Sequence, residues 1–355
     1  MRIVIVKLSS IGDVVHTLPA AALLRRQLPE ARIVWAVDRR ASAILEGSPV
    51  IDELIELDPR AWRNCFWSGP ARVDFRSRLS QLRDGNQNGG KNADVAIDFQ
   101  GLIKSGLVAV ASRAKRRIGF ETAELREKAS RLFLTQQVDT SGFVHVIQKN
   151  LALARAAVAR PGPAKSNGEG AYEFPIAVSS DDERYVDAII ENQSGDFAIL
   201  NPGGGWPTKI WPAERYAELA DWLWSECGLR SFVSYGPGEE ALARAVAAKA
   251  RSGAAQPVAS TVKQFVALAR RASLFVGGDT GPLHLAAASR TPIVGLYGPT
   301  SSRRNGPFDP HDVSVGRDLW CRAECHRRTC WHWECMDIPA SEVKAAVMKR
   351  LADRR

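Results

Sequence analysis

The sequence of 355 residues lacks the features that define several large classes of protein. It contains no apolar run that approaches the ~18 residues that a membrane-spanning helix requires. Its first residues are strand-like and end in a polar turn, unlike the apolar core of a secretory signal peptide. No Gly-x-Gly-x-x-Gly motif follows a predicted strand, which argues against a dinucleotide-dependent dehydrogenase. We therefore expect a chain without membrane spans, either soluble or held at a membrane surface.

Cysteine is scarce outside one cluster near the C-terminus. Four of the six cysteines are Cys321, Cys325, Cys330 and Cys335, and none of their spacings is the Cys-x2-Cys typical of zinc sites. Without an export signal we expect a reducing compartment, in which disulfides are disfavoured. Reduced, packed thiols are the favoured interpretation, and zinc ligation stays open as the alternative.

Positive charge is distributed unevenly along the chain. Residues 1–160 hold 25 Lys and Arg against 16 Asp and Glu, a net charge of +9, whereas residues 161–355 hold 23 of each. A field of one sign attracts a polyanion, such as nucleic acid, anionic lipid or a phosphorylated glycolipid. We therefore expect the first half of the chain to bind an anionic partner.

Two series of alternating strands and helices predict two domains, which the chain length also favours. Strands at 2–6, 32–37, 53–57 and 94–99 alternate with helices such as 18–28 and 102–112, a pattern typical of a parallel sheet. A composition break at residues 159–172 precedes a second alternation. We place an N-terminal domain at 1–160, a linker at 161–175, a C-terminal domain at 176–335 and a final helical segment at 336–355.

The N-terminal run Val6-Lys-Leu-Ser-Ser-Ile-Gly-Asp13 carries the first candidate site. A β-branched strand ends in a Ser-Ser-Ile-Gly turn, and an Ala- and Leu-rich helix is expected from about Asp13 to Leu28. Asp13 then stands at the carboxyl edge of the sheet, where open α/β sheets bind ligands. From this segment alone, Asp13 is equally well explained as a helix N-cap.

A second candidate site is the junction between a buried strand and a helix at residues 275–288. Asp279 or Thr280 can cap the helix, and Pro282 fits its first turn. The free amides and the positive end of the helix dipole predict a phosphate site, which Gly281 lets a ligand approach closely and toward which His284 can point. A tight structural turn is the alternative.

Two Gly-rich loops follow other predicted strands of the second half. The segment Asn201–Pro212 contains three consecutive glycines with Lys209 beyond them. The segment Tyr235-Gly-Pro-Gly-Glu-Glu offers a carboxylate, Glu239 or Glu240, that can accept hydrogen bonds from a ribose diol. An exposed lysine and a first-turn helix acid are the structural alternatives.

Together these segments resemble the bacterial ADP-heptose:lipopolysaccharide heptosyltransferases of glycosyltransferase family 9. The resemblance covers nearly the whole chain, and the N-terminal run is most similar to that of the type I enzymes. It rests on four segments in order, namely Val-Lys-x-Ser-Ser-x-Gly-Asp-x-x-His-Thr-Leu-Pro from Val6, Asp98-Phe-Gln-Gly-Leu-Ile-Lys-Ser105, Gly119-Phe120 and Asp279-Thr-Gly-Pro-Leu-His284.

The resemblance implies the GT-B architecture, two doubly wound Rossmann-like domains facing a central cleft. It implies inverting transfer of L-glycero-D-manno-heptose from ADP-heptose to the Kdo of Kdo-lipid A in lipopolysaccharide inner-core biosynthesis. Asp13 would be the general base. The expected donor-binding residues are Thr208, Lys209, Glu239, Asp279, Thr280, Gly281 and His284. The expected acceptor-binding residues are Ser10, Gly12, Lys104, Arg116 and Arg126, with Lys104 and Arg116 chosen for their charge.

The expected partners follow from the same resemblance. Asp-x-Asp, the usual metal-binding motif of the other large transferase architecture, is absent, so we expect no metal and no cofactor besides the substrate ADP-heptose. The anionic acceptor implies peripheral association with the cytoplasmic face of the inner membrane, and no nucleic acid partner. The alternatives are heptosyltransferase II or another core-glycan transferase of the family and, from a different class, a non-catalytic basic protein that binds membranes or polyanions.

Overall fold

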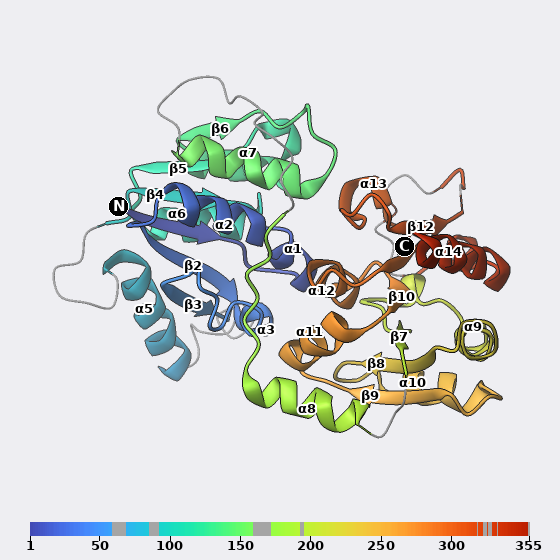
Figure 1. Ribbon diagram of the computed structural model, residues 1–355. Helices are drawn as coiled ribbons and strands as arrows, with labels where there is room; N and C mark the ends of the chain where they lie inside the picture. Colours follow the sequence, from blue (N-terminus) through green and yellow to red (C-terminus); the bar gives the residue numbers. More distant parts are fainter. Residues whose placement is uncertain are drawn as a thin grey trace. The chain divides into compact units, whose positions relative to one another are not determined.

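The computed structural model describes residues 1–58, 69–84, 92–158, 172–191, 195–317, 319–321, 325, 329–331 and 333–353. The chain divides into two compact units, Met1–Ala177 and Val178–Arg355, each of which is described by itself (Figure 1). Within the described residues, no helix has both the length and the apolar character needed to cross a membrane.

The first unit contains a parallel sheet of six strands in the order β3-β2-β1-β4-β5-β6. Its strands are β1 (Arg2–Val6), β2 (Arg32–Asp38), β3 (Glu53–Leu57), β4 (Val95–Asp98), β5 (Arg116–Phe120) and β6 (Gln136–Val138). Its helices are α1 (Ile11–Val15), α2 (Leu18–Gln27), α3 (Arg39–Ser42), α5 (Gly69–Asp84), α6 (Ile103–Ala111) and α7 (Val146–Val158), with short 3-10 helices η2 (Thr122–Glu124) and η3 (Lys128–Phe133).

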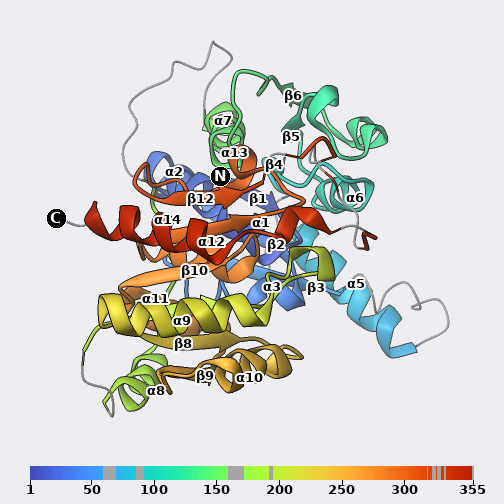
Figure 2. The same ribbon diagram turned by 90° about the vertical axis from the view of Figure 1, so that its right-hand side faces the viewer.

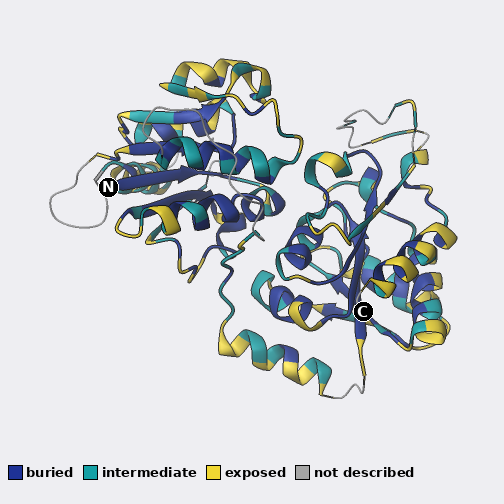
Figure 3. Cartoon of the chain, turned by 45° about the horizontal axis from the view of Figure 1, so that its top comes forward, coloured by how far each residue is buried: buried dark blue, intermediate teal, exposed yellow. Residues whose placement is uncertain are grey.

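Helices cover both faces of this sheet. The helices α2 and α7 pack together on one face, and α5 and α6 lie on the other (Figure 2). All five residues of β1 are buried, as the dark central strands of Figure 3 show. Parallel strands that are covered on both faces have continuous apolar sequences, which is why Ile3-Val-Ile-Val6 predicts this position.

The second unit repeats this plan with the strand order β12-β11-β10-β7-β8-β9, again all parallel. Its strands are β7 (Phe197–Asn201), β8 (Arg230–Tyr235), β9 (Ala255–Ala259), β10 (Leu274–Gly278), β11 (Ile293–Tyr297) and β12 (Val313–Gly316). Its helices are α8 (Ser180–Ile190), α9 (Ala213–Cys227), α10 (Glu240–Lys249), α11 (Val262–Arg271), α12 (Gly281–Ala288), α13 (Ser302–Asn305) and α14 (Ala340–Ala352), with η4 (Pro207–Lys209) and η5 (Glu334–Met336).

The main difference from the sequence prediction lies after β1. The single helix expected from Asp13 to Leu28 is two helices, α1 and α2. The second begins afresh at Leu18 with Thr17 as its N-cap residue, because Pro19 lacks an amide hydrogen and fits only the first turn of a helix. Of the predicted linker, residues 161–171 lie outside the described residues.

Candidate functional site

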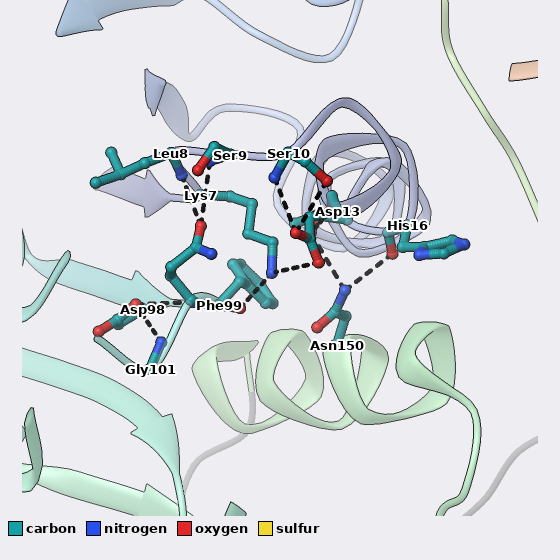
Figure 4. A network of polar contacts seen from close by, with 12 residues as sticks. Lys7, Leu8, Ser9, Ser10, Asp13, His16, Asp98, Phe99, Gly101 and Asn150 are labelled. Carbon is teal, nitrogen blue, oxygen red and sulfur yellow. Dashed lines mark hydrogen bonds and ion pairs between the residues drawn. The ribbon is translucent and has the colours of Figure 1, made fainter. Parts of the chain in front are cut away.

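Asp13 lies at the carboxyl edge of the first sheet. Ser10 is the N-cap residue of α1, and Asp13 is three residues further on. The Asp13 carboxylate turns back and accepts hydrogen bonds from the Ser10 amide (2.8 Å) and the Ser10 hydroxyl (3.2 Å), as Figure 4 shows. Ser10 rather than Asp13 is therefore the N-cap residue, and Asp13 completes a capping box with it. The side chain keeps 28% of its surface exposed, so a ligand can reach it.

Lys7 is the cation nearest to this carboxylate. Its Nζ atom lies 3.7 Å from Oδ1 of Asp13 and donates a 2.7 Å hydrogen bond to the carbonyl of Phe99. Burial raises the pKa of Asp13, but the charge of Lys7 and the Ser10 amide oppose this effect. The charge of Arg126 acts in the same direction, and the net result is a pKa below the ordinary value. Asp13 is therefore an ionised carboxylate at neutral pH.

Hydrogen bonds of the segment that follows β4 hold this edge in place. Asp98 accepts hydrogen bonds from the amides of Gln100 (2.9 Å) and Gly101 (3.1 Å), and from the hydroxyl of Ser105 (2.9 Å). Gln100 in turn accepts hydrogen bonds through Oε1 from the amides of Leu8 (3.1 Å) and Ser9 (3.2 Å). The motif at 98–105 thus fixes the loop that carries Ser10 and Asp13. Sequence reasoning used this motif only for the resemblance and missed its structural role.

The structure brings four of the five expected acceptor residues to the same edge. Ser10 and Gly12 belong to the turn and the first residues of α1, and the charge of Arg126 acts on Asp13. Lys104, in the first turn of α6, is exposed. Burial raises the pKa of Asp38, at the carboxyl end of β2, but Arg40 lowers it below the ordinary value, and the charge of Lys104 acts in the same direction as Arg40.

Arg116 lies elsewhere. It is the first residue of β5, at the opposite edge of the sheet from Asp13. Its guanidinium donates to the Gln136 side chain (3.0 Å) and to the carbonyls of Ala156 (3.0 Å) and Ala157 (3.5 Å). Arg116 therefore ties β5 to β6 and α7. The expected role of Arg116 in acceptor binding is therefore corrected. Arg116 was chosen for its charge alone, but the first residue of a parallel strand lies at the amino edge of the sheet.

In the second unit, the junction between β10 and α12 has the predicted form. Thr280 is the N-cap residue of α12, and its hydroxyl forms no cap bond with the first-turn amides. It donates instead to the carbonyl of Gly278 at 3.3 Å. Gly281 and Pro282 open the helix. The positive end of the α12 dipole therefore faces the carboxyl edge of the second sheet, in the position expected of an anion site.

Asp279 forms the centre of a polar network at this edge. His284 Nε2 lies 3.1 Å from Oδ1, and Lys209 Nζ lies 3.0 Å from Oδ2 and 2.7 Å from the backbone carbonyl. Asn305 contacts Oδ2 at 3.3 Å. Burial raises the pKa of Asp279, but His284 and Lys209 outweigh it and hold the pKa far below its ordinary value. Asp279 therefore orients Lys209 and His284, two of the residues that were expected to bind the donor.

Lys209 also contacts an aromatic ring. Its ammonium group lies 4.7 Å from the centroid of the Trp206 ring. Thr208, next to it on η4, is buried. The Gly-rich loop after β7 therefore positions Lys209 beside Asp279 at the carboxyl edge, with Thr208 as its neighbour in the chain.

The structure also distinguishes Glu239 from Glu240. The Glu239 carboxylate lies over Gly203, where a Cβ atom would come within 2.4 Å of it, and accepts a hydrogen bond from the Gly236 amide at 3.3 Å. Glu240 is exposed and pairs with Arg244 on the outer surface of α10 at 2.7 Å. Glu239 is thus the carboxylate directed toward the Gly-rich loop.

Cys321, Cys325, Cys330 and Cys335 are all partly buried. Burial and the neighbouring Cys330 raise the pKa of Cys335. Among the described residues, no three His, Cys, Asp or Glu side chains are arranged to hold a metal ion. Residues 322–324, 326–328 and 332 lie outside the described residues, so zinc ligation stays an open alternative.

Comparisons with known proteins identify the family. The sequence profile of glycosyltransferase family 9 (heptosyltransferase) matches residues 85–332. Lipopolysaccharide heptosyltransferase 1 of Pseudomonas aeruginosa is 28% identical over 331 residues, covering 93% of this chain and 87% of its own. The Salmonella typhimurium protein of the same name is 29% identical over 315 residues, covering 88% of this chain and 93% of its own.

Solved structures share the fold. Escherichia coli heptosyltransferase WaaC with ADP superposes with a TM-score of 0.76 at 24% identity, over 99% of this chain and 100% of that chain. The prediction of a GT-B fold built from two doubly wound domains is thereby confirmed. The profile match spans well over half of the sequence, and the chain belongs to glycosyltransferase family 9.

Proposed function

We propose that this glycosyltransferase moves L-glycero-D-manno-heptose from ADP-heptose to the Kdo of Kdo-lipid A, in inner-core lipopolysaccharide biosynthesis. The observation that carries the proposal is the similarity to lipopolysaccharide heptosyltransferase 1 over 93% of the chain. The polar carboxyl edges of the two sheets supply groups of the chemistry that this reaction needs.

The donor is assigned to the second unit. The α12 N-terminus and Lys209 would neutralise the diphosphate, whose negative charge grows as the glycosidic bond breaks. Glu239 would accept hydrogen bonds from the ribose hydroxyls. The ion pair with Asp279 places Lys209 before the donor arrives, so little reorganisation is needed on binding.

The acceptor and the general base are assigned to the first unit. The acceptor hydroxyl oxygen attacks the anomeric carbon as the bond to the β-phosphate oxygen breaks, and ADP leaves with the bonding electrons. Asp13 accepts the hydroxyl proton, and displacement from the opposite face inverts the anomeric configuration. Arg126 and Lys104 would bind the anionic groups of the acceptor.

We further propose that the reaction needs no metal and no cofactor, because α12 and Lys209 carry the positive charge that a cation would otherwise supply. The anionic lipid acceptor places the protein at the cytoplasmic face of the inner membrane as a peripheral protein.

A turnover screen of ADP- and UDP-sugars against Kdo-lipid A tests the assignment. Transfer from ADP-heptose alone, to Kdo, is the expected result. Transfer only to an acceptor that already carries heptose would instead support heptosyltransferase II, and ADP binding without any transfer would support a non-catalytic protein. Either result would overturn the proposed reaction.

A further inference from the structure

The α6–η3 surface of the first unit combines exposed apolar side chains with unpaired basic ones. Four large apolar residues on it are solvent-exposed, although neighbouring residues of the same helices are buried. They are Ile103 (41%), Leu107 (53%), Val110 (42%) and Leu132 (79%). Contiguous apolar patches rimmed by polar groups mark interaction sites rather than ordinary surface.

The apolar residues form one ridge. Ile103, Leu107 and Val110 follow one another at helical spacing along the outer side of α6. The 3-10 helix η3 packs beside them, since the ring of Phe133 fills the space next to Gly106, where a Cβ atom would come within 2.4 Å of it. This packing puts Leu132 at the flank of the ridge. On the other flank lies α5 (Figure 2).

The charge around the ridge is predominantly positive. Residues 103–132 contain eight Lys and Arg and three Glu, a net charge of +5 (8 − 3). The exposed basic residues around the ridge form no ion pair within 4.0 Å with any described residue. They are Lys104, Arg113, Arg126, Lys128 and Arg131. Unpaired cations beside an apolar ridge suit the headgroups and acyl boundary of an anionic membrane.

The ridge also adjoins the candidate acceptor edge. The α6 helix begins directly after the 98–105 segment, and the amide of Ile103 donates to the Glu127 carboxylate at 2.6 Å. The positive charge of Arg126, next to Glu127, contributes to lowering the pKa of Asp13. The N-terminal end of the ridge therefore lies next to the segment that carries the candidate acceptor edge.

We infer that the α6–η3 surface is the membrane-docking surface of this protein, with anionic phospholipid headgroups bound by Arg113, Lys128 and Arg131 and the apolar ridge inserted among them. This inference deepens the proposed function, on which its biological meaning rests, and commits to a lipid surface rather than to a second copy of the chain.

The test is cosedimentation of the full-length protein with vesicles, without any donor or acceptor. Vesicles of phosphatidylcholine alone are compared with vesicles that also contain phosphatidylglycerol. The variant R131Q/L132Q removes one exposed basic and one exposed apolar residue of the surface. The matched control M348Q/K349Q removes the same pair of types from the exposed side of α14 in the second unit.

The wild type should bind the anionic vesicles and bind neutral vesicles only weakly. Because each basic residue strengthens binding to an anionic surface about fivefold, R131Q/L132Q should bind at least about tenfold more weakly. The control should bind as the wild type does. Equal binding to both kinds of vesicle, or equal loss in the two variants, would overturn the inference.

Two further measurements distinguish a membrane-docking surface from an acceptor subsite and from a dimer interface. Transfer to a short acceptor without acyl chains should be unchanged in R131Q/L132Q, since no residue of the donor or base assignments is altered. If the wild type transfers heptose but does not bind vesicles, the inference of a docking surface would be overturned, whereas the proposed function would stand. Dimerisation lost in L107Q/L132Q, without vesicle binding by the wild type, would assign the ridge to a second copy instead.

Discussion

At the scale of single residues, the account depends on two carboxylates in different settings. Asp13 is partly exposed and held by the Ser10 turn, next to the nearly buried Lys7. Asp279 is buried and bonded to Lys209 and His284. The first is accessible to a substrate hydroxyl, whereas the second is saturated by protein partners. This difference in accessibility is the reason why we propose Asp13 for the chemistry and Asp279 for positioning Lys209 and His284.

The charge of Lys7 should set the pH range of activity. Since Lys7 lowers the pKa of Asp13, Lys7→Met should raise that pKa and move the acid limb of the kcat/KM profile to higher pH. Lys115→Met, which changes an exposed lysine of the same unit, should leave the limb in place. If the acid limb of Lys7→Met is unchanged or moves to lower pH, Asp13 does not control the pH profile of kcat/KM.

Asp279→Asn should destabilise the second unit. Breaking a buried ion pair from one side costs about 3 kcal/mol of unfolding free energy. Because the folded-state pKa of Asp279 is depressed, its contribution is present above the unfolded pKa of about 4 and is lost as the pH falls. Denaturant unfolding should therefore show a large difference from the wild type at neutral pH and a smaller one in acid.

The matched control is Asp181→Asn, which alters an exposed ion pair with Arg184 on α8. It should change the unfolding free energy very little, because solvent screens such pairs. Equal losses in the two variants, or a loss in Asp279→Asn that does not shrink in acid, would contradict the assigned network.

At the scale of elements, the carboxyl edges of the two sheets were the most predictable feature. The strand run Ile3–Val6 and the Gly-Gly ending of β10 place Asp13 and Asp279 correctly, because apolar continuity and chain-breaking glycines are local signals. The placement of Arg116 was missed because residues 116–120 were not predicted as a strand, whose first residue lies at the amino edge of a parallel sheet. The bonds of Gln100 were not predictable, because their partners lie about 90 residues away in the chain. Those of Asp98 join residues within seven positions and were open to prediction.

The Gly-rich loop after β7 offers a test of the donor site with a control on the same loop. In Gly203→Ala the new Cβ atom would meet the Glu239 carboxylate, whereas at Gly205 no atom lies within 4 Å of such a Cβ. The Glu239 side chain is flexible, so Gly203→Ala should fold normally with its carboxylate displaced. A hydrogen bond to a charged group contributes about 1.5–3 kcal/mol, so ADP affinity should fall about 10- to 100-fold.

Calorimetric titration measures the ADP affinity of both variants. The affinity of Gly205→Ala should lie within about twofold of the wild type, because its new Cβ atom would contact no other atom. Unchanged affinity in Gly203→Ala would remove Glu239 from the donor site.

At the scale of the whole molecule, the chain length and two series of alternating strands and helices predicted the two-domain plan, and the fold was confirmed. Sequence did not reveal the α6–η3 surface, because exposure of Leu107 and Leu132 depends on how η3 packs beside α6. An apolar residue in a helix is expected to face the core until the tertiary packing is known.

The proposed metal independence is also tested on the whole enzyme. Since α12 and Lys209 are proposed to neutralise the leaving diphosphate, activity in excess EDTA should equal activity in magnesium. Reversible loss on chelation, restored by magnesium or manganese, would show that a cation carries part of this charge.

The most direct test of the central claim is the rate of heptose transfer from ADP-heptose to Kdo-lipid A by Asp13→Asn and the wild type. Asn keeps the size of the side chain and can still accept the Ser10 amide, so thermal stability and ADP affinity should be normal. Loss of a general base lowers kcat by about 10²–10⁴-fold, which is the result we predict. A variant that retains more than about a tenth of the wild-type kcat would contradict the account.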